Sequence, residues 1–205
     1  MIKKKKHRWM FLLGLILSQG SCINIPSGKN DASHLFYLET QKSASKTWEG
    51  IPKVSWQLFI EEPETDARLD TDRVIINKGN GEVTHAHGIR WVERLPLLIL
   101  QLLFDLFDQS QKIKGVGSAL DSIDADYILL IDVKTFEFMP CSKEVRIRLN
   151  AKLMDAQNRE IVGGKTFQRE ISVLDESMDH VMSAFIQSIN EVGRDLVRWT
   201  LTCSS

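Results

Sequence analysis

The chain of 205 residues is 43% hydrophobic and 26% charged, as expected for a single packed globular domain. Its formal net charge of −1 is unevenly distributed: residues 1–21 contain five basic residues and no acidic one, so the remainder carries −6. This acidic surplus argues against nucleic acid as a partner, and against docking on anionic lipid through basic residues.

The N-terminal block has the order of an export signal. Four lysines (Lys3–Lys6) and Arg8 precede the apolar run Trp9–Leu17, and small residues follow before Cys22. A helix that spans a membrane needs about 20 apolar residues. This run is about half that length, which favours the core of a signal peptide over a span that stays in the membrane. A buried N-terminal helix is the alternative interpretation.

The small residues permit two cleavage sites. An ordinary cut would follow Gly20, and a lipoprotein cut would lie between Ser21 and Cys22. The block resembles a bacterial lipoprotein signal, in which the cysteine thiol receives a diacylglyceryl group before cleavage. Ser21 and Gly20 fit this pattern, whereas Gln19 departs from it.

This signal divides the chain into three parts. We expect a lipoprotein signal peptide over 1–21 and a tether over 22–33 that begins with lipidated Cys22. The tether is small and polar, as a flexible linker is. One domain then follows over 34–205.

Strand patterns begin with the stretch "HLFYLE" (34–39), which predicts a first strand. The stretch "KVSWQLFIEEP" (53–63) alternates apolar with polar residues, as a half-buried strand does. Residues 73–91 predict a hairpin that turns at "KGNG" (78–81). Trp48 lies in the loop between the first two strands and is the best candidate for an exposed aromatic contact.

The period then changes to that of a helix over 96–111, with Pro96 in the first turn. The polar residues of this run fall on one narrow stripe: Gln101, Asp105, Asp108 and Gln109. All other positions from Pro96 to Phe107 are apolar, which predicts a largely buried helix.

Three further strand patterns and a second helix pattern complete the chain. Residues 125–139 are apolar on both faces in their first half, which indicates a central strand. Residues 144–155 alternate regularly, and 163–173 return as the next strand after a turn. Apolar residues over 177–201 recur at helical spacing. We therefore expect one α/β domain: a mixed, mainly antiparallel sheet of about six to eight strands with two main helices packed on it.

Two motifs that suggest chemistry are incomplete. The stretch "GGKT" (163–166) lacks the earlier glycine of a phosphate-binding loop, because Arg159 stands at that position. The neighbouring residues Asp121, Asp124 and Asp126 lack the glycine and the terminal glutamate of a calcium loop.

The stretch "HAH" places His85 and His87 on the same side of the expected strand. Two imidazoles could begin a zinc site, but a catalytic zinc requires a third protein ligand, and a solvated hairpin edge is the alternative. We therefore expect no metal, no cofactor and no enzymatic activity. A periplasmic metal-dependent hydrolase that uses His85 and His87 is the alternative hypothesis.

Three stretches occur in a recognisable order between residues 34 and 200. "HLFYLE" follows the cysteine of the signal, "GIRWVERLP" leads into a helix, and a late run ends in "INEVGRDLVRW". The most specific part is Arg90-Trp91 followed by Pro96. In this combination the chain resembles the ABC-type transport auxiliary lipoproteins.

The resemblance implies a non-catalytic lipoprotein at the periplasmic face of the outer membrane of a Gram-negative bacterium, with a fold similar to the amino-terminal domain of TolB. It implies a partner, the periplasmic MCE-domain protein of an ABC transporter (including the paraquat-inducible type) that moves lipids, for which the lipoprotein is a dock or terminus. Ile23 after Cys22 favours the outer membrane. A homo-oligomer, and a lipid carrier with an apolar cavity under the helix 97–107, are further alternatives.

Lipidation of Cys22 would leave two thiols, Cys141 and Cys203, in an oxidising periplasm. Cys141 follows an expected strand, and Cys203 follows the final helix. A disulfide would join them if that helix returned to the same rim of the domain. The alternative is one partly buried thiol and one free thiol on a frayed tail.

Overall fold

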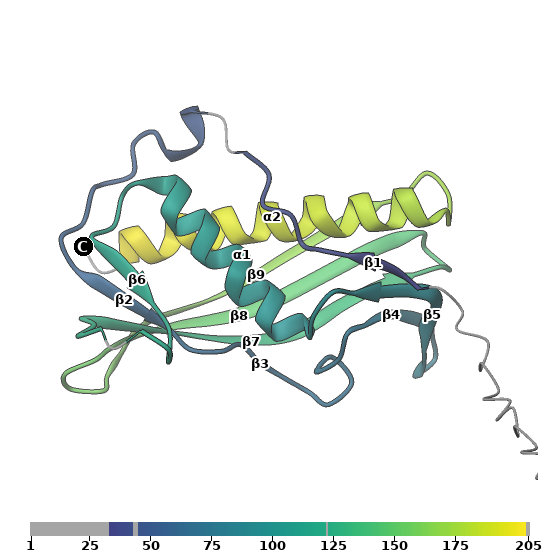
Figure 1. Ribbon diagram of the computed structural model, residues 1–205, viewed down its shortest axis with the longest axis horizontal. Helices are drawn as coiled ribbons and strands as arrows, with labels where there is room; N and C mark the ends of the chain where they lie inside the picture. The colour runs from purple at the N-terminus through teal and green to yellow at the C-terminus, as the bar shows by residue number, and fades with distance from the viewer. Residues whose placement is uncertain (1–32, 43–44, 122, 204–205) are drawn as a thin grey trace, which may run out of the picture. The chain divides into compact units, whose positions relative to one another are not determined.

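The computed structural model describes residues 33–42, 45–121 and 123–203. The described residues form a mixed sheet of nine strands and two α-helices that both lie on one face of the sheet (Figure 1). The expected α/β fold, with a mixed sheet and two main helices, is confirmed. The expected signal peptide, Cys22 and all of the tether except Ser33 lie outside the described residues.

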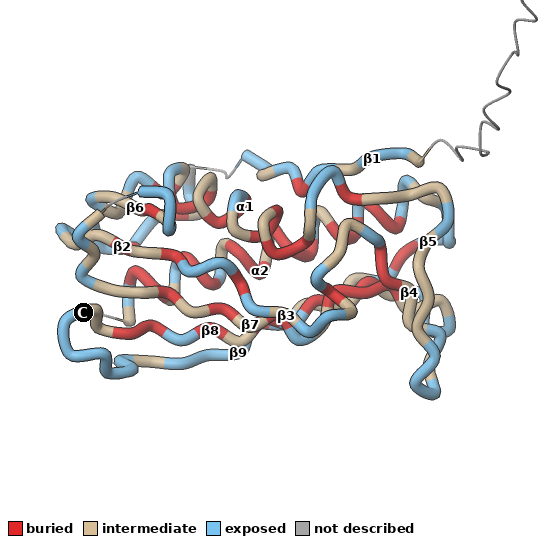
Figure 2. Tube along the Cα trace, turned by 60° about the horizontal axis from the view of Figure 1, so that its bottom comes forward, coloured by how far each residue is buried: buried red, intermediate tan, exposed pale blue. Residues whose placement is uncertain are grey.

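The long strand β7 (Tyr127–Met139) is the centre of the sheet, as its apolar first half predicts. One edge of β7 pairs antiparallel with β8 (Glu144–Asp155), which pairs in turn with the edge strand β9 (Ile161–Ser172). The alternation predicted for β8 is confirmed, because its inward-facing residues are at most 1% exposed: Val145, Ile147, Leu149, Ala151 and Leu153. Figure 2 shows this alternation and the exposed edge strand β9.

The other edge of β7 is shared by three short strands in succession. β2 (Gln57–Ile60), β3 (Glu64–Thr65) and β4 (Arg73–Gly79) each pair with it in parallel. β6 (Gly115–Gly117) extends the sheet beyond β2. The long ladders of the sheet are antiparallel, whereas each parallel ladder joins at most three residue pairs, so the sheet is mainly antiparallel.

The predicted hairpin consists of β4 and β5 (Glu82–Trp91), which pair antiparallel. The chain reverses at Asn80 and Gly81, whose φ angles of 53° and 82° lie in the left-handed region that these two residue types tolerate best. β1 (His34–Phe36) pairs in parallel with β5 and ends the sheet on that side.

The two helices correspond to the two predicted runs. α1 (Leu95–Ser110) has Pro96 in its first turn and ends at Gln111, whose left-handed backbone lets its N–H donate to the carbonyl oxygen of Asp108 at 3.2 Å. α2 (Met178–Cys203) lies along β8 and β9 and also contacts α1. Both helices therefore cover the same face of the sheet (Figure 1).

The interpretation of Trp48 as an exposed contact is wrong. Trp48 ends a short 3₁₀ helix, η1 (Ser45–Trp48), and is only 6% exposed. Arg198 of α2 donates a hydrogen bond to the carbonyl oxygen of Thr47, which fastens this turn to the helix. The tryptophan therefore packs into the core although its sequence context is that of a loop.

Candidate functional site

The Arg90-Trp91-Pro96 motif lies at the junction between β5 and α1. Trp91 is 2% exposed, and its ring meets Phe136 and Phe185 edge to face, with ring centroids 5.8 and 5.6 Å apart. Edge-to-face packing of this kind adds to the hydrophobic stabilisation of buried aromatic rings. Trp91 therefore anchors the junction in the core, between β7 and α2.

Ion pairs and hydrogen bonds hold the polar side of this junction. The backbone N–H of Trp91 donates to the carbonyl oxygen of Asp72 at 2.7 Å, and the Arg90 guanidinium lies 3.0 Å from the Asp72 carboxylate. Arg94 pairs with Glu62 at 2.6 Å and with Asp70 at 2.5 Å. These contacts position the start of α1, so the motif has a structural role.

The two histidines of the hydrolase hypothesis lie on β5. His85 is half-buried opposite Ile75, and its Nδ1 has no hydrogen-bond partner among the described residues; His87 is exposed. The described residues contain no group of three or more histidine, cysteine, aspartate or glutamate side chains that could hold a metal ion. The hydrolase hypothesis therefore gains no support from the arrangement of these histidines.

Sequence reasoning missed a serine–histidine–aspartate cluster at the start of α2. His180 Nδ1 lies 3.0 Å from Ser177 Oγ and 2.8 Å from Asp175 Oδ1. Hydrogen bonding by Ser177 and then by His180 holds the pKa of Asp175 well below its ordinary value. In a catalytic triad the serine and the carboxylate contact different ring nitrogens. Because both meet the same nitrogen here, the cluster does not have the arrangement of a catalytic triad, and its contacts join residues at the start of α2.

The structure does not bring Cys141 and Cys203 together, so the disulfide considered possible from the sequence is not formed. Cys141 lies in the turn between β7 and β8, where its Sγ contacts the carbonyl oxygen of Lys78 at 3.4 Å. Cys203 ends α2 beside Gly163, the register partner of Leu153 near the far end of β8. Both thiols are free. The final helix reaches the opposite end of β8 from the one that carries Cys141.

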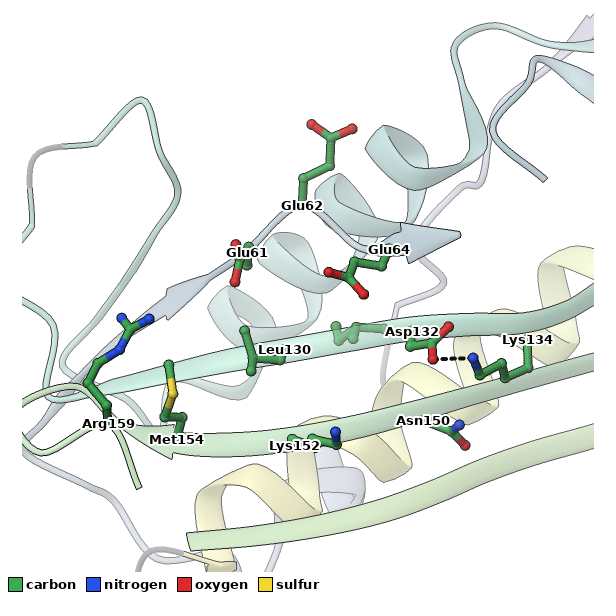
Figure 3. A pocket seen from close by; sticks show the side chains of 11 residues that line it. Glu61, Glu62, Glu64, Leu130, Asp132, Lys134, Asn150, Lys152, Met154 and Arg159 are labelled. Carbon is green, nitrogen blue, oxygen red and sulfur yellow. Dashed lines mark ion pairs between the residues drawn. The ribbon is translucent and has the colours of Figure 1, made fainter. Parts of the chain in front are cut away.

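A groove of about 510 Å³ lies on the face of the sheet that the helices leave uncovered (Figure 3). Its lining combines apolar side chains, Leu130 and Met154, with carboxylates and bases. The charged lining residues are Glu61, Glu62, Glu64, Asp132, Lys134, Lys152 and Arg159. Since both signs are present, and Asp132 and Lys134 already pair with each other, the groove has no clear preference for an anion or a cation.

A second concave surface, which we call the α1 cleft, has a volume of about 590 Å³ and runs along the outer side of α1. Its apolar lining residues are Tyr37, Val92, Leu97, Leu98, Leu100, Phe104, Val116 and Leu120. Its polar lining residues are Glu93, Gln101, Asp108, Ser118 and Asp121. Lysine and arginine are absent from this lining.

The lipid-carrier hypothesis placed an apolar cavity under this helix. The side of α1 that faces the sheet is packed instead, with Ile99, Leu102, Leu103 and Leu106 completely buried. The open space lies on the outer side of α1, where the sequence pattern indicated only core.

Solved structures share this open mixed sheet with two helices on one face. A crystal structure of a protein from Xanthomonas campestris is 27% identical, with a TM-score of 0.78, and the match covers 84% of this chain and 97% of that one. A hypothetical protein from Chlamydia trachomatis has a TM-score of 0.51 at 7% identity, covering 73% of this chain and 99% of that one, and so shows the fold alone.

The fold is thus that of a class of small α/β domains, and comparison of the sequence with family models identifies the family. The model of the family described as the ABC-type transport auxiliary lipoprotein component matches residues 36–197, and the chain belongs to this family. A curated relative from Bradyrhizobium diazoefficiens, an uncharacterised protein, is 26% identical over 154 residues. The match covers 72% of this chain but only 40% of the relative, so the chain spans about two fifths of that relative's length. Among the described residues, neither helix is long and apolar enough to cross a membrane.

Proposed function

We propose that the protein is a non-catalytic lipoprotein of the outer membrane that serves as the dock or terminus of an MCE-type ABC transport system. The transported molecules would be lipids, and the direct partner would be the periplasmic MCE-domain component. The observation that carries the proposal is the family match over residues 36–197, which extends from the end of β1 into α2. The family match therefore covers nearly all of the described domain.

The proposed anchor is Cys22, with the chain before it removed as a signal peptide. Five basic residues, a short apolar run and small residues in front of the cysteine support this assignment. One acyl chain binds a membrane only weakly and reversibly, so stable attachment requires the several chains of a complete lipoprotein modification. Cells fed a clickable palmitate should label the wild type and not Cys22→Ala. Equal labelling of the two proteins would remove the anchor from the proposal.

The proposed partner is tested by crosslinking in the native cell. The full-length lipoprotein, carrying a C-terminal affinity tag, is crosslinked in intact cells and purified under denaturing conditions. We expect an MCE-domain protein in the purified complex and its absence when Cys22→Ala prevents anchoring. An MCE-domain protein that is expressed in the same cells but never crosslinks to the wild type would contradict the proposed partnership.

A further inference from the structure

α1 has a second apolar stripe that the other described elements bury only in part. Leu97, Leu100 and Phe104 recur at spacings of three and four residues, lie on one side of the helix, and are each half-buried. The opposite side of α1 belongs to the packed core. A helix that is apolar all round is normally covered on all sides. Here the outer stripe forms one wall of the α1 cleft, which is open.

Exposed apolar side chains from other segments of the chain gather at the same cleft. Tyr37 is 42% exposed, Val92 is 48% exposed and Leu120 is 95% exposed, and all three line it. They come from the segment after β1, the β5–α1 junction and the loop after β6. Isolated exposed apolar residues are ordinary, but a contiguous apolar patch on a folded protein marks an interaction surface.

The polar part of the lining carries one sign of charge. Its charged side chains are Glu93, Asp108 and Asp121, and the lining includes no lysine or arginine. A further carboxylate, that of Asp105, is not part of the lining but is hydrogen-bonded to Gln101, which is. Gln101 donates to one of its oxygens at 3.2 Å, and Thr40 donates to the other at 2.9 Å. The cleft thus combines an apolar wall with an acidic rim, and a charge-complementary occupant must be basic.

This charge pattern selects between two classes of occupant. An anionic phospholipid would bring a net negative charge to an acidic rim, and the two would repel each other, whereas a zwitterionic phospholipid has no net positive charge to match the rim. A polypeptide segment with an apolar stripe and flanking lysine or arginine would satisfy both the wall and the rim. Apolar anchors at helical spacing, set in a groove on the partner, are a recurring mode of peptide recognition.

We propose that the α1 cleft docks a segment of a partner protein that presents an apolar stripe flanked by lysine or arginine. The inference rests on the proposed function and deepens it, because the segment would belong to the periplasmic transport component. The outer stripe of α1, together with Leu120 and Val92, provides the apolar contact. Glu93 and Asp108 provide the attraction for the basic flanks.

A binding experiment tests the chemistry of the cleft directly. The full lipoprotein is placed in phosphatidylcholine nanodiscs, and a fluorescent 14-residue leucine–lysine helical peptide is titrated, with empty nanodiscs as the blank. Leu120→Gln, at a fully exposed position, should weaken binding about tenfold, since one buried leucine is worth at least that factor. The matched control is Leu174→Gln, at a leucine that is 80% exposed and outside the cleft, and it should bind as the wild type does.

A second pair of variants tests the acidic rim. Glu93→Gln with Asp108→Asn should weaken binding and flatten its dependence on salt, because screened charge pairs lose strength as ionic strength rises. Glu160→Gln with Asp179→Asn, which removes two exposed charges outside the cleft, should change neither. A leucine–glutamate peptide of the same length should not bind. Equal binding of the two peptides, or equal binding by Leu120→Gln and Leu174→Gln, would overturn the proposal.

Other occupants give different results. If Leu120→Gln converts an oligomer into a monomer and the peptide does not bind the wild type, a second copy of the chain fills the cleft. If the peptide binds only after deletion of residues 23–32, the chain's own tether fills it. Either result overturns the inference. An MCE-domain protein that crosslinks equally to wild type and Leu120→Gln would also refute the cleft assignment while leaving the proposed function intact.

Discussion

Gly193 of α2 lies directly against Leu106 of α1. A Cβ atom on Gly193 would come within 2.5 Å of Leu106 Cδ1 and within 3.1 Å of Leu102 Cδ2. Both leucines are completely buried, so they have little room to move away. The glycine therefore sets how closely the two helices approach each other on the sheet.

We expect Gly193→Ala to lower the free energy of unfolding by about 1 kcal/mol. Overpacking a core costs about 1–3 kcal/mol, and alanine returns about 1 kcal/mol of helix propensity. Gly193→Val adds more volume without that full return, and should cost about 3 kcal/mol. Urea unfolding of the three proteins measures both values.

Gly164→Ala is the matched control for this prediction. A Cβ atom on Gly164 would meet its nearest neighbours at 3.7 and 3.9 Å, which is ordinary contact. This substitution should not lower the stability and should raise it by at most about 1 kcal/mol, because glycine inside a strand is less favourable than alanine. A Gly193→Ala protein more stable than the wild type would contradict the prediction, because it would mean that α1 and α2 can move slightly apart without a loss of free energy of unfolding.

The family motif should divide into one residue that stabilises the fold and one that contributes little. Trp91→Ala removes a buried ring that packs edge to face against both Phe136 and Phe185, and should cost about 3–5 kcal/mol. Arg90→Ala removes an ion pair whose side chains are 42% and 39% exposed, and should cost less than about 1 kcal/mol. Thermal and urea unfolding check both, and an Arg90→Ala cost equal to that of Trp91→Ala would contradict this division.

The regular elements could be predicted because their burial follows one simple period. In β8 each inward residue is apolar and each outward one from Glu144 to Lys152 is polar, and the apolar stripe of α2 recurs every three or four residues. The side of the central strand β7 that is buried was harder to predict from the sequence. Lys134 is an extra residue in β7, where the register jumps between Val133 and Thr135, so the buried side changes parity along the strand.

The candidate site could not be predicted, for a physical reason. On α1, Leu100 and Phe104 line an open cleft, whereas Leu102 and Leu103 are core, yet all four read alike in the sequence. Which apolar residues remain uncovered depends on the segments that pack beside the helix, such as the one that contains Tyr37. The same dependence explains Trp48, because its burial requires α2 to lie alongside the loop.

Cys141 and Cys203 should both react with an alkylating reagent in unreduced protein taken from the native envelope. From Glu144 to Leu153, strand geometry gives a separation of about 30 Å, whereas a disulfide needs Cα atoms within about 7 Å. The two cysteines lie at the two ends of this stretch. Mass mapping after alkylation under denaturing, non-reducing conditions measures the two thiols. A peptide pair that joins Cys141 to Cys203 would contradict the arrangement of α2 along β8.

Asp175 should make stability depend on pH in the acidic range. Its carboxylate accepts a hydrogen bond from the backbone N–H of Ser177 at 2.9 Å and lies 2.8 Å from His180 Nδ1. Hydrogen bonding by the Ser177 side chain, then by His180 and then by the Ser177 backbone N–H holds the pKa of Asp175 well below its ordinary value of 3.8. Since the folded protein has the lower pKa, the unfolded chain takes up the proton first as the pH falls. The stabilisation is therefore complete above the ordinary pKa and is lost as the pH falls toward the lower, folded-state pKa.

Asp175→Asn isolates this contribution, because the amide oxygen can still accept from Ser177 while the charge is gone. The difference in unfolding free energy between wild type and Asp175→Asn should shrink as the pH falls below about 4. Urea unfolding at a series of pH values measures it. Ser177→Ala removes the largest cause of the lowered pKa and should flatten the same acidic limb while Asp175 is still present. A difference between wild type and Asp175→Asn that persists unchanged to pH 2, or that appears only above pH 7, would contradict the assignment of this pH dependence to Asp175.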